Sequence, residues 1–204
     1  MKNSSRILAT ICGLLLGFSF TFVPRAAQAG TITVDTVADL VDGDVSSIAN
    51  LIATPGTDGK ISLREAISAA NNTVGADIIL FDSSTNGSPL TLTGASGEDA
   101  NVSGDLDIIG SDDLTITGNG IANTIIQAGT TTTNGIDRVF DIIFNTGSDV
   151  TFENLTIRHG RIFGPDGGGI QALGRSVTVT NSTISDNTAG DGGAIRSLGG
   201  AVTV

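Results

Sequence analysis

The sequence has no tryptophan and no tyrosine, and its single cysteine, Cys12, lies in an apolar run near the N-terminus. Exported domains are free to use disulfides, but the chain after this run has no cysteine and must be stabilised by packing. Sugar subsites generally rely on exposed faces of Trp or Tyr. The absence of both side chains therefore argues against a carbohydrate-active groove within these residues.

Basic residues are also scarce. The chain has 10 Lys or Arg residues against 21 Asp or Glu residues, and three of the basic ones lie in the first 29 positions. The rest of the chain therefore has seven basic residues and a net charge of −14. Such a surface repels nucleic acid and anionic lipid head groups, so no nucleic-acid partner is expected. It favours solubility and is compatible with divalent cations.

The first 29 residues have the three parts of a secretory signal. Lys2 and Arg6 form a positive start, residues 7–22 are an uncharged apolar run, and Ala27-Gln28-Ala29 is a small-x-small cleavage motif. A comfortable membrane span needs roughly 20 apolar residues, and this run is shorter. We predict a cleavable signal peptide over residues 1–29 and a secreted or cell-surface protein with no membrane span in its mature part; an uncleaved anchor is the alternative.

A repeat is the main positive feature of the sequence. Residues 149–157 (DVTFENLTI) and 176–184 (SVTVTNSTI) share one pattern at an offset of 27 residues. The glycine motifs at 167–170 (GGGI) and 192–195 (GGAI) are 25 residues apart, and a third copy begins near Val202. The difference between the two offsets predicts a small loop insertion around residues 161–165 in the first copy.

Each copy alternates apolar and polar residues, as Val177 and Val179 do with their threonine neighbours. Alternation of this kind is typical of a strand with one buried face. No copy can bury its apolar face alone, and a fixed period of this length indicates stacked coils. The residues therefore predict an all-β protein built as a solenoid of parallel strands.

Two residue pairs at equivalent repeat positions are expected to have structural roles. Asn154 and Asn181 each follow a strand pattern, and we interpret them as an internal ladder in which side-chain amides bond from coil to coil. Gly168 and Gly193 belong to the repeated glycine motifs, and we expect them to form tight turns.

Residues 30–82 differ from the repeats and predict an N-terminal capping module. Residues 31–35 (TITVD) form an expected strand, residues 39–55 are expected to be irregular, and Ser62 and Glu65 have the spacing of a helix capping box. We predict one short α-helix over residues 63–70 that covers the apolar end of the first coil. Further strands are expected at 77–82, 89–93, 105–109, 113–117, 124–127 and 139–144.

Two motifs resemble known families. Residues 61–67 (ISLREAI) resemble the CSLREA-type N-terminal module of exported bacterial β-helix proteins, over roughly residues 31–82. The GGGI and GGAI repeats resemble the chlamydial polymorphic outer-membrane-protein repeat, over roughly residues 149–204. The sequence departs from both patterns, with Ile61 in place of the cysteine of the first and Ile184 in place of the Phe of the FxxN element of the second.

The resemblance implies a right-handed parallel β-helix that is displayed at the cell surface or released from it, often in adhesin-like proteins. The expected organisation is a signal peptide at 1–29, the capping module at 30–82 and β-helix coils at 83–204. Because the third copy breaks off at Val204, we expect the coils to be truncated at the C-terminal end.

No catalytic constellation is evident in the sequence. His159 is the only histidine and forms a small basic patch with Arg158 and Arg161. Polysaccharide-cleaving β-helices place such residues near paired acids, but hydrolysis needs two carboxylates at a defined separation, and no paired-acid motif accompanies this patch. We interpret it as a solvated turn and expect no catalytic residue.

Calcium is the ligand that the acidic residues of the sequence suit best. Residues 54–65 align with the last part of an EF-type loop, with Asp58 and Glu65 at ligand positions, but Thr54 and Gly56 stand where two carboxylates are expected. The weak calcium candidates in the capping module are therefore Asp58, Glu65, Asp42 and Asp44. Glu98 and Asp99 with Asp105 are a further weak possibility. We expect no cofactor, with calcium as the one open alternative.

The leading functional hypothesis is an exported, non-enzymatic β-helix segment for structural display or adhesion. The partner class would be an extracellular glycan or a component of a host or cell surface. The alternative is the N-terminal part of a polysaccharide lyase or glycoside hydrolase whose catalytic coils follow residue 204. A third hypothesis is a module stabilised by calcium.

Overall fold

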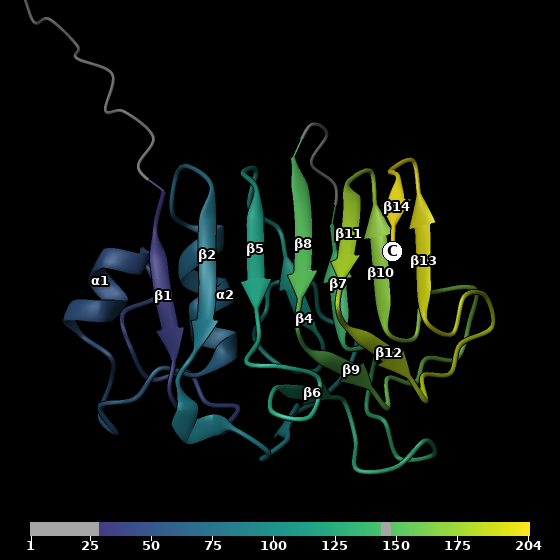
Figure 1. Cartoon of the computed structure of the whole chain (residues 1–204), viewed down its shortest axis with the longest axis horizontal. Coiled ribbons are helices and arrows are strands. Elements are labelled where there is room, and N and C mark those ends of the chain that lie inside the picture. Colours follow the sequence, from purple (N-terminus) through teal and green to yellow (C-terminus); the bar gives the residue numbers. More distant parts are fainter. Residues whose placement is uncertain (1–28, 144–147) are drawn as a thin grey trace, which may run out of the picture.

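The protein consists mostly of parallel β-sheet with few helices (Figure 1). The computed structural model describes residues 29–143 and 148–204. The strands are β1 (Thr31–Val34), β2 (Asp77–Phe81), β3 (Leu90–Thr91), β4 (Leu106–Ile108), β5 (Leu114–Thr117), β6 (Ile125–Gln127), β7 (Phe140–Ile142), β8 (Asp149–Glu153), β9 (Thr156–Arg158), β10 (Ile170–Leu173), β11 (Ser176–Thr180), β12 (Thr183–Ser185), β13 (Ile195–Leu198) and β14 (Val202–Thr203). Each strand segment expected from the sequence contains one of these strands, although Phe144 lies outside the described residues.

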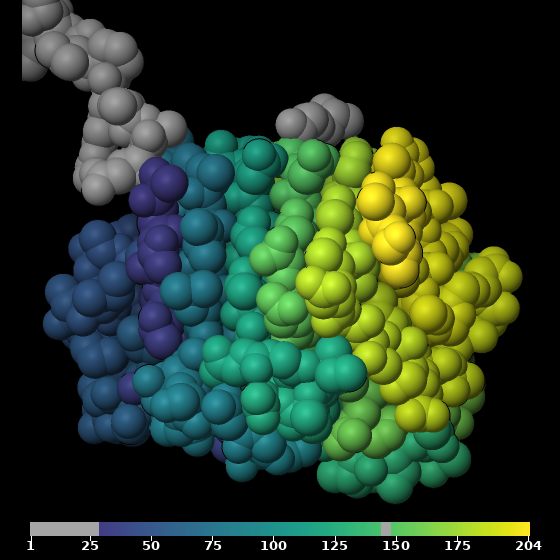
Figure 2. All heavy atoms as spheres, viewed as in Figure 1, coloured from purple at the N-terminus to yellow at the C-terminus, as the bar shows by residue number. Residues whose placement is uncertain are grey.

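The strands form three sheets. Sheet 1 has the order β1-β2-β5-β8-β11-β14, sheet 2 has the order β4-β7-β10-β13, and sheet 3 has the order β3-β6-β9-β12. From β4 onward the chain visits sheets 2, 1 and 3 in turn and then returns to sheet 2, so that one such passage is one coil. Figure 2 shows successive segments as neighbouring bands from the N-terminal to the C-terminal end. The predicted stacking of parallel strands is confirmed.

The repeat offsets are the pairing registers of the sheets. Val177 pairs with Val150 and Val179 with Phe152, 27 residues apart, and Ile170 pairs with Ile195, 25 residues apart. The apolar members of these pairs in β8 and β11 are buried, as the alternation predicts. The insertion expected at 161–165 is a loop. Apolar residues repeat along the chain because each coil places them in the same column of one core.

The asparagine ladder predicted at Asn154 and Asn181 is wrong. Both residues have a left-handed backbone, with φ of 55° and 48°, and Asn181 is exposed to solvent, so the two side chains do not form an internal ladder. Their role is conformational, because Asn tolerates the left-handed region better than most residues where a strand must turn sharply.

Another asparagine links neighbouring coils instead. Asn187 accepts a hydrogen bond from Gly160 N at 2.7 Å and donates one to Ile157 O at 3.2 Å. The glycines beside it allow close approach of the backbones. A Cβ on Gly168 would lie 2.8 Å from the carbonyl oxygens of both Gly193 and Thr188. Gly168 and Gly193 both lie at bends of the chain, and close contact between coils is an additional reason for glycine at position 168.

The capping module has two α-helices, and the expectation of one short helix is corrected. Helix α2 (Leu63–Asn71) begins with the expected capping box of Ser62 and Glu65. Helix α1 (Ile48–Ala53) lies in the segment expected to be irregular, where Ser47 caps it and only Ile48 and Leu51 are buried. Six residues offer too few apolar positions for a helical period to be evident in the sequence. A 3₁₀ turn, η1 (Ser83–Thr85), follows β2.

The capping module and the coils share one sheet, because β1 pairs with β2 and β2 pairs with β5. Both helices lie at the N-terminal end of the stack (Figure 1). The signal peptide predicted at 1–29 falls outside the described residues apart from Ala29. Across residues 29–143 and 148–204, no helix has the length and apolar character needed to cross a membrane.

Candidate functional site

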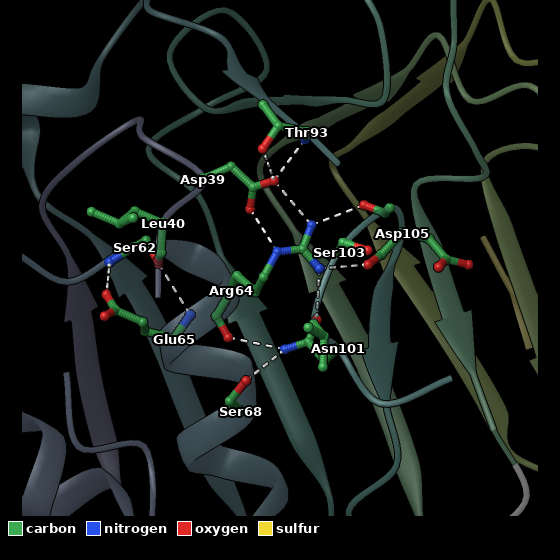
Figure 3. A network of polar contacts seen from close by, with 12 residues as sticks. Asp39, Leu40, Ser62, Arg64, Glu65, Ser68, Thr93, Asn101, Ser103 and Asp105 are labelled. Atoms are coloured by element: carbon green, nitrogen blue, oxygen red, sulfur yellow. Dashed lines mark hydrogen bonds and ion pairs between the residues drawn. The ribbon is translucent and has the colours of Figure 1, made fainter. Parts of the chain in front are cut away.

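A buried arginine joins helix α2 to the loop that precedes β4 (Figure 3). Arg64 is 2% exposed and forms a two-point ion pair with Asp39, with Nε–Oδ1 and Nη2–Oδ2 distances of 2.7 and 3.0 Å. It also donates to Gly104 O and Asp105 O, each at 2.8 Å, and to Asn101 Oδ1 at 3.3 Å. All five N–H groups of the guanidinium are therefore used, which fixes the loop against the capping module.

The loop over residues 94–104 folds onto β4 through Asn101. The Asn101 amide donates to Arg64 O at 3.0 Å and to Ser68 Oγ at 2.9 Å, both on α2. Its backbone N donates to Asp107 Oδ2 at 2.7 Å. Glu98 holds the loop together, since its Oε1 accepts from the backbone N of Val102 and Ser103. Asp107 is thus enclosed at the face of the sheet that points away from the apolar core.

A polar row crosses sheet 2 on that face. Asp107 of β4 pairs with Asp141 of β7, Asp141 pairs with Gln171 of β10, and Gln171 pairs with Arg196 of β13. Strand alternation directs their apolar neighbours, such as Leu106, to the core and these side chains to the opposite face. Asp107 and Asp141 are nevertheless only 0% and 4% exposed. The sequence therefore places two carboxyl groups on adjacent strands under a cover.

One arginine stands among many acids at this face. Arg138 Nε lies 3.3 Å from Asp105 and 3.9 Å from Asp137, its Nη1 contacts Asp141, and its Nη2 lies 3.8 Å from Asp166. Gln171, with its amide oriented to satisfy both neighbours, donates to Asp166 Oδ1 at 2.9 Å and accepts from Arg138 Nη1 at 2.7 Å. The acidic cluster is defined here as the six residues Asp99, Asp105, Asp107, Asp137, Asp141 and Asp166.

Burial changes the ionisation of three members of the acidic cluster. Loss of solvation raises the pKa of Asp105 to about 8, with repulsion from Asp137 and Asp107 adding to it and Arg138 opposing it. Burial likewise raises the pKa of Asp107 to about 7 and that of Asp141 to about 6. One oxygen of each of these three carboxyl groups, Oδ1, is buried without a hydrogen-bond partner. Neutral pH therefore favours a bound proton or a bound cation here.

Three members of the cluster have the geometry of metal ligands. Asp99, Asp107 and Asp141 each offer a carboxylate oxygen, and these oxygens lie within 4.8 Å of one another. Asp99 is exposed and belongs to the loop over β4, whereas the other two are buried in adjacent strands. No other such group of acidic, His or Cys side chains occurs in residues 29–143 and 148–204.

A groove of about 360 Å³ adjoins the acidic cluster. Its wall includes Asp99, Asp105, Arg138 and the insertion loop, in which Arg161 lies 4.1 Å above the ring of Phe163. Phe163 is 82% exposed. An exposed ring beside charged groups can contact a sugar or another amphipathic ligand.

The calcium candidates of the capping module do not converge on a site. Glu65 uses Oε1 to accept from Asp42 N and Gly43 N at 2.9 and 2.8 Å, and Oε2 to accept from Ser62 N at 2.9 Å. Each of the other three carboxylates makes a local hydrogen bond, with Asp42 Oδ2 bonded to Thr57 N, Asp44 to Ser46 N and Asp58 to Lys60 N. Asp42 Oδ1 is buried without a partner, but none of these carboxylates belongs to a group with metal-ligand spacing among the described residues. Hydrogen bonds from Thr57 and Ser46 lower the pKa of Asp42 and Asp44, respectively.

The second set of calcium candidates is only partly brought together. Asp99 lies with Asp107 and Asp141, and Asp105 is a neighbour in the same cluster. Glu98 is committed to the backbone of its own loop. The residues that sequence reasoning missed are Asp107, Asp141, Arg138 and Arg64. A usable signal was present for the first two, because each is an aspartate in the middle of an apolar strand segment.

The basic patch does not act as one unit. His159 Nδ1 lies 3.0 Å from Gly129 O, and Arg158 Nε donates to Gln127 Oε1 at 2.9 Å. Arg161 instead packs on Phe163 and reaches the groove. The three residues therefore have separate local partners, and Arg161 alone borders the acidic cluster.

The fold and this site together define a parallel β protein with a buried acidic cluster on one face of a sheet. Comparisons of the chain with family models, curated proteins and solved structures find no match.

Proposed function

We propose that the chain is an exported segment of a right-handed parallel β-helix that serves structural display or adhesion and has no catalytic role. The similarity of residues 61–67 to the CSLREA-type module and of the glycine repeats to surface-protein repeats supports export and display. The observation that carries the proposal is the parallel, in-register pairing of sheet 1 from β1 to β14. Each added coil extends such a stack by about 4.8 Å and keeps the outer faces available for contacts.

The groove beside the insertion loop is the surface that we assign to adhesion. Phe163 is exposed there, and the Arg161 guanidinium over its ring holds it in place. Acidic and basic groups on the same wall can hydrogen-bond to hydroxyl groups. These features suit an extracellular glycan, because sugars combine an apolar face with many hydroxyls.

The experiment is a glycan-array and cell-surface binding assay of the purified protein, followed by affinity measurements on the best ligand. Phe163→Ala should weaken binding roughly fivefold, because an aromatic contact contributes about 1 kcal/mol. Val74→Ala is the matched control, since Val74 is also an exposed apolar residue and lies in the capping module. Equal binding by both variants, or no binding by the parent protein, would contradict an adhesive role for the groove.

Polysaccharide cleavage is the second candidate function, in which catalytic coils beyond residue 204 would complete the site. It is favoured by Asp105, whose raised pKa of about 8 keeps a proton available at neutral pH beside the groove. Against it, Asp105 and Asp107 are 2% and 0% exposed, whereas hydrolysis needs two carboxyl groups that reach the substrate. Cleavage of a polysaccharide by the parent protein that Asp105→Asn abolishes would replace the display function with this one.

A further inference from the structure

Residues from two successive coils meet at the acidic cluster. Asp99 comes from the loop over β4, Asp107 from β4 itself and Asp141 from β7 in the next coil. We propose that these three carboxylates bind one hard divalent cation, for which Ca²⁺ is the best-fitting ion, and that the cation fastens the loop to sheet 2. This proposal is independent of the adhesive role of the groove.

Unpartnered oxygens are the observation that points to a ligand. Oδ1 of Asp107 and Oδ1 of Asp141 are buried and accept no hydrogen bond, although the second oxygen of each carboxyl group does. A buried polar atom without a partner costs about 1–3 kcal/mol. The loop supplies one backbone N–H group, that of Asn101, and it donates to Asp107 Oδ2. Asp107 and Asp141 each also place one carboxylate oxygen within 4.8 Å of the other and of Asp99, so these carboxyl groups combine unused acceptor capacity with the spacing of metal ligands.

The charge balance also favours a cation. Arg138 is within 4 Å of carboxylate oxygens of four cluster members, namely Asp105, Asp137, Asp141 and Asp166. Asp166 has a second ion-pair partner in Arg196, at 3.6 Å. Asp107 and Asp99 have no basic partner within ion-pair distance among the described residues. A divalent ion at the Asp99, Asp107 and Asp141 oxygens would neutralise the charge that Arg138 leaves uncompensated.

The ligand set selects the class of ion. It consists of carboxylate oxygens without nitrogen or sulfur, which suits Ca²⁺, Mg²⁺ or Mn²⁺ and not softer metals. Oxygens up to 4.8 Å apart can surround Ca²⁺, whose bonds of about 2.3–2.6 Å reach across such a site. Asp99 is exposed, so the open side leaves room for the water ligands that complete the coordination shell. Mg²⁺, with bonds of about 2.0–2.1 Å, demands near-ideal octahedral geometry, whereas Ca²⁺ accepts the flexible geometry of ligands from a loop and two strands.

The alternative occupant of the same space is a proton. The buried carboxyl groups of Asp107 and Asp141 can share one proton, and in that state they would bind a cation only weakly. The two cases separate experimentally, because a cation site responds to Ca²⁺ at neutral pH whereas a shared proton responds only to pH.

The test is isothermal titration calorimetry and thermal unfolding of the metal-stripped protein with Ca²⁺, Mg²⁺ and Mn²⁺. We expect one Ca²⁺ per chain, with a Kd in or below the range of about 10⁻⁴–10⁻³ M known for extracellular calcium modules. At a hundredfold excess over Kd, the melting temperature should rise by roughly 5–10 °C. No binding of any of the three ions, with an unchanged melting temperature, would overturn the proposal.

Three isosteric variants locate the site. Asp107→Asn and Asp99→Asn should each weaken Ca²⁺ binding by at least about tenfold, and Asp99→Asn decides alone if the buried variant does not fold, because Asp99 is exposed. Asp58→Asn is the matched control, since Asp58 is an exposed calcium candidate from the sequence. The proposal is also overturned if Asp99→Asn binds Ca²⁺ like the parent protein, or if Asp58→Asn loses binding.

Discussion

Arg64→Met should strongly reduce the free energy of unfolding of the protein. The change removes all five hydrogen bonds of a guanidinium that is 2% exposed and leaves the Asp39 carboxylate, which is 6% exposed, without its cation. It also removes donors from the backbone carbonyls of Gly104 and Asp105. Breaking a buried ion pair by removing one partner costs about 3–5 kcal/mol. For a domain of this size the melting temperature should fall by roughly 6–20 °C.

The assay is calorimetry or far-ultraviolet circular dichroism, because the chain has no Trp or Tyr for intrinsic fluorescence. Lys60→Met is the control, since the Lys60–Asp35 pair is half exposed at 3.3 Å and should contribute within about 1 kcal/mol. Combining Arg64→Met with Asp39→Asn should cost less than the sum of the single changes, because the two side chains interact directly. A loss for Arg64→Met no greater than that for Lys60→Met, or strict additivity with Asp39→Asn, would refute the proposed role of Arg64 as the anchor of the loop.

Three further predictions test the coils and the acidic cluster. Asn187→Ala should destabilise the fold by about 1–3 kcal/mol, because it leaves the Gly160 N–H group unpaired. Asn181→Gly should be nearly neutral in the same denaturant-unfolding assay. A larger loss of stability for Asn181→Gly than for Asn187→Ala would restore the ladder interpretation. Val179→Asp should prevent cooperative unfolding or lower its midpoint strongly, since Val179 is 5% exposed and an unpaired charge would be buried; a parent-like transition would show that this position does not face the core. Without metal, the protein should lose stability as the pH rises from about 4 to about 8, because the raised pKa values of Asp105, Asp107 and Asp141 mean that the folded state binds more protons than the unfolded state in this window. Melting temperatures that are flat or rise over this range would contradict the ionisation assigned to the cluster.

The architecture could be predicted because a stacked coil repeats its requirements along the chain. Val150 and Val177 occupy one inward column, and the 27-residue offset between them is the register of β8 against β11. The capping box at Ser62 and Glu65 is likewise a local motif whose hydrogen bonds connect residues three positions apart. Features of this kind are evident in a single sequence because the interacting residues keep a fixed spacing.

The acidic cluster could not be predicted in the same way. Asp107 and Asp141 are 34 positions apart, an offset that differs from both repeat offsets, and their contact depends on the irregular coil that contains the loop over β4. The five hydrogen bonds of the Arg64 guanidinium likewise reach residues that are between 25 and 41 positions away in the sequence. The sequence did show an aspartate in the middle of each of two apolar strand segments. It does not show that the loop over residues 94–104 buries the face of the sheet on which these aspartates lie.

A crystal structure of the protein grown with Ca²⁺ tests the central claim most directly. We expect a right-handed stack of parallel coils, and a density peak bound by Asp99, Asp107 and Asp141 at oxygen distances of about 2.3–2.6 Å. A stack of the opposite hand would contradict the proposed β-helix. Absence of the peak, with the oxygens of Asp107 and Asp141 at about 2.5–2.7 Å from each other, would show that a shared proton and not a cation occupies the acidic cluster.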